Sequence, residues 1–74
     1  MKVEHNKVHS SSERTYLFQT VLGSGTVKLF AKIQGMDVYT LLKDFEKDEM
    51  VAVELPNGQW KAEITGDAKV AVST

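Results

Sequence analysis

Apolar and polar residues alternate along most of the chain, and the alternation is clearest on either side of Asn57-Gly58. An Asn-Gly pair is the strongest short-range hairpin signal, because a type I′ turn needs a positive φ at both central residues. A two-residue turn here predicts an antiparallel hairpin of residues 51–55 with 60–64, in which Glu54 faces Lys61 on the polar side. One face of this hairpin then collects the apolar side chains Val51, Val53, Leu55, Trp60, Ala62 and Ile64.

The first half of the chain contains a second predicted hairpin. Residues 15–22 are rich in β-forming side chains, and residues 26–33 alternate with period two. The Gly-Ser-Gly sequence at residues 23–25 separates them as a turn. A two-residue Ser-Gly turn places Leu22 beside Val27, whereas a three-residue loop places Val21 there. The first register is preferred because it puts more apolar residues on the core face.

Residues 36–48 are predicted to form a helix. Asp37 suits the N-cap position, and Met36 and Leu41 then occupy the positions of a hydrophobic staple. Apolar residues repeat at i, i+3, i+4 and i+7, which is typical of a helix lying on a sheet. This stripe is expected to be buried against the C-terminal strands and consists of Val38, Leu41, Leu42 and Phe45.

Together these elements predict an α+β fold. A mainly antiparallel sheet of five to six strands, in the order (β)ββαβββ, carries one helix on one face. Residues 69–73 supply the last strand and add Val70 and Val72 to the buried face, while residues 2–8 are a candidate first strand. The expected domain organisation is a flexible or weakly structured segment at residues 1–14 and an α+β domain at residues 15–74.

The composition narrows the class of protein without naming a chemistry. The chain has 74 residues and a net charge of −1, which leaves room for one domain and argues against a general polyanion binder. It has no cysteine, which excludes disulfides, thiolate catalysis and cysteine-ligated zinc. No apolar run reaches the roughly 20 residues that span a bilayer, and the first residues lack the apolar core of a signal peptide. We therefore expect a cytoplasmic protein with no membrane partner.

Side chains with catalytic or metal-binding chemistry are few and scattered. His5 and His9 are four apart and near Glu4, but no third and fourth ligand follow at a recognisable spacing. The turn at residues 23–25 is too short for a phosphate-binding loop and precedes a strand rather than a helix. We predict a non-enzymatic protein with no catalytic residue, no metal site and no cofactor.

The outward face of the first predicted hairpin is the candidate partner-binding surface. Leu17 and Val21 point away from the core, and Phe30 lies outward between Lys28 and Lys32. Exposed apolar side chains rimmed by lysines are typical of interaction surfaces. These five residues predict a small protein-binding domain, acting as an inhibitor, adaptor or assembly subunit, whose partner is another protein or a second copy in a homodimer. The alternative partner is single-stranded nucleic acid, with bases stacked on Phe30 and phosphates at Lys28 and Lys32.

Two short segments resemble known families. Residues 25–30 resemble the opening strand of cold-shock domains, and residues 51–73 are similar to the meander of small SH3-like barrels in their Asn-Gly-Gln-Trp turn. The first likeness ends at residue 30, and no ligand motif accompanies the second. We therefore assign the chain to no family.

Overall fold

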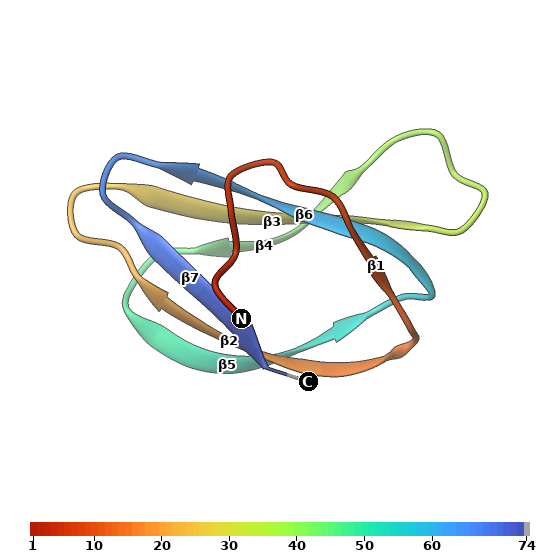
Figure 1. Ribbon diagram of the computed structural model, residues 1–74, viewed down its shortest axis with the longest axis horizontal. Coiled ribbons are helices and arrows are strands. Elements are labelled where there is room, and N and C mark those ends of the chain that lie inside the picture. The colour runs from red at the N-terminus through yellow and green to blue at the C-terminus, as the bar shows by residue number, and fades with distance from the viewer. Residues whose placement is uncertain (74) are drawn as a thin grey trace.

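Two antiparallel sheets and no helix make up residues 1–73, the part of the chain that the computed structural model describes. A four-stranded sheet has the order β1-β6-β3-β4, and a three-stranded sheet has the order β5-β2-β7. Figure 1 shows the two sheets as separate layers. The strands are β1 (His9–Ser11), β2 (Arg14–Val21), β3 (Thr26–Ile33), β4 (Thr40–Phe45), β5 (Glu49–Leu55), β6 (Gly58–Thr65) and β7 (Lys69–Ser73).

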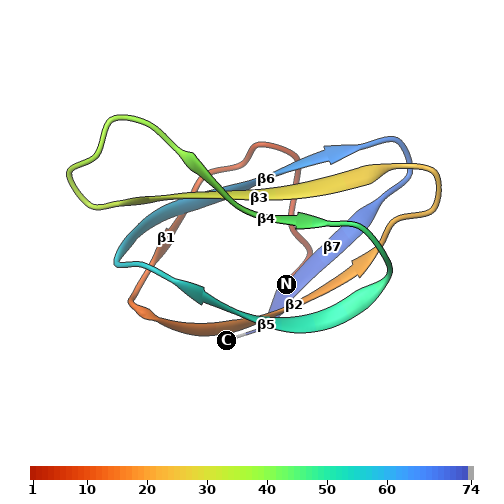
Figure 2. The same cartoon turned by 180° about the vertical axis from the view of Figure 1, so that it is seen from behind.

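The chain passes from one sheet to the other at nearly every connection. Among the seven described strands, only β3 and β4 are both consecutive and paired. The other connections, such as that at residues 22–25 between β2 and β3, carry the chain between layers (Figures 1 and 2). The buried apolar side chains of the two sheets therefore face one another between the layers, as in a β-sandwich.

The predicted α+β fold is wrong in two respects, the first of which is strand pairing. β2 and β3 lie in different sheets, as do β5 and β6, so neither predicted hairpin forms. The strands themselves are close to those predicted, and β3 and β7 have the expected bounds. The alternation of apolar and polar residues shows that one face of a strand is buried. It does not show whether the next strand in the chain pairs beside it in the same sheet or packs opposite it in the other sheet.

The second error is the helix over residues 36–48. Residues 40–45 form β4, which pairs with β3 through Val27 opposite Phe45 and Phe30 opposite Leu41. The register shifts by one residue at Leu42, a β-bulge that interrupts the period of two. Because of the bulge, two adjacent apolar residues, Leu41 and Leu42, fit into one strand. Their spacing from Phe45 is that of apolar residues on one face of a helix.

The core lies between the two sheets, and three aromatic rings stand at its centre. Phe18 on β2 contacts Trp60 on β6 edge-on at 5.4 Å between ring centroids and lies 6.3 Å from Phe45 on β4. The predicted burial of the C-terminal strands is confirmed for six residues and is partial for two more, Val51 and Ile64. The six buried residues are Val53, Leu55, Trp60, Ala62, Val70 and Val72. Of the predicted helical stripe, only Phe45 is buried.

The N-terminal segment closes one side of the sandwich. Val72 N–H donates to the Met1 carbonyl at 2.8 Å, and Val3 N–H donates to the Val70 carbonyl at 2.9 Å, so residues 1–3 pair with the free edge of β7. Further along, Asn6 N–H donates to the Ala62 carbonyl at 2.8 Å on β6. Figure 1 shows the segment running from one layer to the other. Residues 1–14, expected to be weakly structured, thus include β1 and the buried Val3.

Gly58 begins β6 for a reason other than the predicted turn. Neither it nor Asn57 has a positive φ, so the type I′ turn is absent. Gly58 is instead buried opposite Ile33 and Ser11, where a Cβ atom would lie 2.1 Å from the Lys32 carbonyl oxygen. Glycine is needed here because the backbones of β3 and β6 approach too closely for a side chain.

We therefore expect Gly58→Ala to destabilise the fold by about 3 kcal/mol or more, since backbone rather than a flexible side chain would have to move. The matched control is Gly35→Ala, which meets no atom within 4 Å and is strained only by its φ of 96°. It should cost about 1–2 kcal/mol. Urea unfolding of both variants gives the comparison, and equal losses would contradict the close-approach explanation.

Candidate protein-binding surfaces

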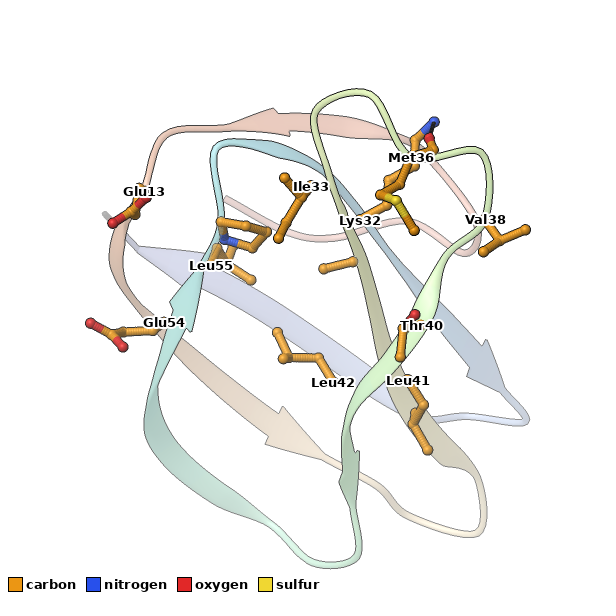
Figure 3. Close-up of a pocket in the computed structure, with 12 residues that line it drawn as sticks. Glu13, Lys32, Ile33, Met36, Val38, Thr40, Leu41, Leu42, Glu54 and Leu55 are labelled. Atoms are coloured by element: carbon orange, nitrogen blue, oxygen red, sulfur yellow. Dashed lines mark hydrogen bonds between the residues drawn. The ribbon is translucent and has the colours of Figure 1, made fainter.

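β4 and β5 are the edge strands on the side of the sandwich away from the N-terminal segment (Figure 2). A groove lies between them (Figure 3). Its volume is about 470 Å³. The buried side chains of Ala31 and Leu55 lie at its base, so the groove leads directly to the core. Its mouth is lined by five apolar side chains that are between 43% and 62% exposed, namely Ile33, Met36, Val38, Leu41 and Leu42.

The bulge in β4 brings neighbouring leucines to this groove. In a regular strand, Leu41 and Leu42 would point to opposite faces of the sheet. The extra residue at Leu42 changes that direction, and both side chains line the groove. Further along β4, Lys43 Nζ lies over the buried Phe45 ring, 5.3 Å from its centre.

The charge at the rim of the groove is mainly negative. Glu13 and Glu54 lie on the side opposite Met36 and Val38 (Figure 3). Lys32, the one cation among the lining residues described, is turned to other partners: its Nζ donates to the Met36 carbonyl at 3.2 Å. The groove therefore presents apolar side chains along its length and two carboxylates at one end.

The outer face of the three-stranded sheet forms a second apolar surface. Leu17 and Val21 on β2 are 47% and 48% exposed, and the register places Leu17 between Ala52 on β5 and Ser73 on β7. Met50, 65% exposed, completes the patch on β5. A shallow hollow of about 330 Å³ lies beside Leu17 and Met50.

The outer face of the four-stranded sheet carries aromatic rings and lysines. Phe30, half-buried, lies at the register position between Leu41 and Lys61. Tyr39, in the loop before β4, folds over this face: its ring centre lies 4.6 Å from Lys61 Nζ and 5.3 Å from Lys32 Nζ. Lys28, further along β3, is opposite Asp44 and Glu63.

The five residues predicted to form one binding surface therefore lie on two. Because β2 and β3 belong to different sheets, Leu17 and Val21 face away from Lys28, Phe30 and Lys32. Sequence reasoning missed the groove, because the pattern at Val38, Leu41 and Leu42 was interpreted as the buried stripe of a helix. The feature that could have indicated the groove is the pair of adjacent leucines, Leu41 and Leu42, which breaks the alternation expected of a strand. The bulge explains this break.

The two histidines do not face a common site. His5 Nδ1 accepts a hydrogen bond from the Ile64 N–H at 2.9 Å. The His9 ring instead stacks on Trp60 at 4.5 Å between centroids, and its buried Nε2 has no hydrogen-bond partner. Within residues 1–73, no group of three or more His, Cys, Asp or Glu side chains is arranged to hold a metal ion.

Comparison with known proteins found no match for this chain. The chain matches no family model, no curated protein and no solved structure. Among residues 1–73 there is also no helix of the length and apolar character that a membrane span requires.

The environment of His9 leads to a prediction about pH. Burial lowers the pKa of His9 below its usual 6.5, the nearby charge of Lys7 lowers it further, and Glu4 raises it. The unfolded chain therefore binds more protons than the folded chain as the pH falls below 6.5, so the folded state is destabilised there. His9→Gln should reduce the fall in melting temperature between about pH 7.5 and about pH 5.5, a range above the carboxylate pKa values.

The control for this prediction is Val8→Gln, a change at an exposed side chain beside His9 that leaves both histidines in place. It should retain the acid-dependent fall of the wild type. A His9→Gln variant with the same pH dependence as the wild type would contradict the role assigned to His9.

Proposed function

We propose that the protein is a small non-enzymatic protein-binding domain, an inhibitor, adaptor or assembly subunit, that takes apolar side chains of a partner into the groove between β4 and β5. The observation that carries this proposal is the exposure of five large apolar side chains at the mouth of one groove. Leaving such side chains in water is unfavourable by about 25 cal/mol for each Å² that a partner would cover. Contiguous patches of this kind mark interaction sites.

The charge of the rim supports a particular kind of partner. Glu13 and Glu54 lie at one end, and Lys32 is engaged by the Met36 carbonyl and the Tyr39 ring. The partner that fits is a segment with apolar side chains and a lysine or arginine beside them. We propose the cytoplasm as the location, supported by a sequence without cysteine.

The groove is tested by Val38→Asp, which puts a charge at a position that is 62% exposed in the free protein. Because this side chain has little contact with the core, the melting temperature should change little. Binding should weaken by about 2 kcal/mol or more if Val38 meets a partner in a desolvated contact. The readout is comparative capture from an extract of the source cells, quantified by mass spectrometry, followed by titration with the purified partner.

The matched control is Val8→Asp, an apolar side chain 49% exposed and away from the groove. The partner should be retained by the wild type and by this control, and lost by Val38→Asp. Equal retention by all three proteins would exclude the groove as the binding site.

A second candidate function is the binding of single-stranded nucleic acid on the outer face of the four-stranded sheet. The observation that favours it is the gathering of Phe30 and Tyr39 with Lys32 and Lys61, because stacking rings and lysines together are typical of such surfaces. The acidic neighbours of Lys28 and the net charge of −1 weigh against it.

If this face binds single strands, a fluorescent oligothymidine should bind with an affinity that falls steeply with salt. Phe30→Ala should then remove one stacking contact, worth about 1–3 kcal/mol, while the variant stays folded. Thermal melting of the variant separates loss of stacking from loss of fold. Absence of oligonucleotide binding by the wild type at low salt would exclude this candidate.

A further inference from the structure

We propose that the outer face of the three-stranded sheet binds a second copy of the chain, in a two-fold dimer held by reciprocal ion pairs between Glu54 and Lys69. This inference concerns the outer sheet face rather than the groove, although Glu54 also lies at the rim of the groove, and it does not rest on the proposed function. It is carried by the mainly apolar centre of the face and by the position of its charges.

The centre of the face is mainly apolar. Leu17, Val21 and Met50 are exposed there beside the small side chains of Ala52 and Ala71, and one polar residue, the exposed Gln19, lies between Leu17 and Val21 on β2. Leu17, Val21 and Met50 project beyond the two alanines. An apolar sheet face of this kind packs on a second sheet face, as the two inner faces of the sandwich already do.

The charges of the face lie at diagonally opposite corners. The register places Glu54 on β5 opposite Thr15, at one end of β2, and Lys69 on β7 opposite Val21, at the other end. Because β5 and β7 flank β2, the two charges also lie on opposite edges. Lys2, beside Ala71 on the free edge of β7, adds a second positive charge to the basic edge.

This arrangement selects one kind of dimer. A two-fold axis in the plane of the interface, perpendicular to the line joining Glu54 and Lys69, exchanges the two corners. Glu54 of each copy then lies against Lys69 of the other, giving two ion pairs on either side of a mainly apolar centre. An axis along the strands or straight across them would leave both charges unpaired, so the oblique orientation is favoured.

The size of the face sets the expected affinity. Three strands at about 4.8 Å spacing, with about 3.3 Å per residue over residues 15–21, make a patch of about 14 by 23 Å. This is well below the roughly 800 Å² per partner of a standard interface. We therefore expect a weak dimer that forms only at high protein concentration.

The test is sedimentation equilibrium of the purified chain at low salt, up to about 1 mM, with charge-reversed variants. Glu54→Lys alone and Lys69→Glu alone should each weaken dimerisation at least tenfold, because each creates two like-charge contacts per dimer. An equimolar mixture of the two variants should dimerise again, because every contact in that heterodimer is between opposite charges. The double variant should also recover.

Two further variants separate this face from the groove. Leu17→Glu should abolish the dimer, whereas Val38→Asp should leave it unchanged. A wild-type monomer throughout the concentration range would overturn the proposal, as would a dimer that Val38→Asp disrupts. A wild-type dimer without recovery in the mixture would overturn the proposed pairing of Glu54 with Lys69. Because no other protein is present, these results are independent of partner binding at the groove.

Discussion

The contact between Phe18 and Trp60 joins the two sheets, and the rest of the structure depends on it. The rings meet edge-on at 5.4 Å, an arrangement in which the positive edge of one ring faces the negative face of the other. Both side chains are almost fully buried, at 1% and 2% exposure. Trp60 is further covered by the His9 ring from β1, so three strands meet at one indole. A small domain buries a limited fraction of its surface, and the largest fully buried side chains among residues 1–73 are Trp60, Phe18 and Phe45.

The same contact explains which parts of the fold the sequence could predict. Alternation correctly marked Trp60 as buried, and the strands at residues 26–33 and 69–73 have the predicted bounds. The alternation did not indicate which residue Trp60 contacts. The prediction placed Trp60 beside Leu55 in one sheet, whereas Trp60 packs against Phe18 of the opposite sheet. Pairing is decided by long-range contacts, which no local pattern contains. The Asn-Gly signal was misleading because Gly58 is required for a close backbone approach, not for a turn.

The groove between β4 and β5 could not be predicted from the sequence, because the bulge at Leu42 that helps to form it also disrupts the strand pattern. The bulge at Leu42 breaks the alternation of β4, so Leu41, Leu42 and Phe45 acquire helical spacing in the sequence. Helix burial was then the simplest explanation of their apolar character. In the structure the bulge leaves Leu41 and Leu42 partly exposed and directs them to the groove. Bulges are concentrated at sheet edges and binding sites because they redirect side chains in this way.

The N-terminal segment covers one side of the sandwich and leaves the other side open, and the proposed binding groove lies on the open side. On the β7 side, residues 1–3 and Asn6 satisfy backbone groups of β7 and β6, so the strand edge there is covered. On the other side, Lys43 Nζ lies over the Phe45 ring at one end, while the buried Ala31 and Leu55 line the groove at the other. An uncovered edge with apolar side chains favours association, and natural proteins usually protect such edges. β4 carries both a bulge, which discourages indiscriminate strand pairing, and exposed leucines, which favour contact through side chains. The combination is suited to a specific partner that fills the groove rather than to one that extends the sheet.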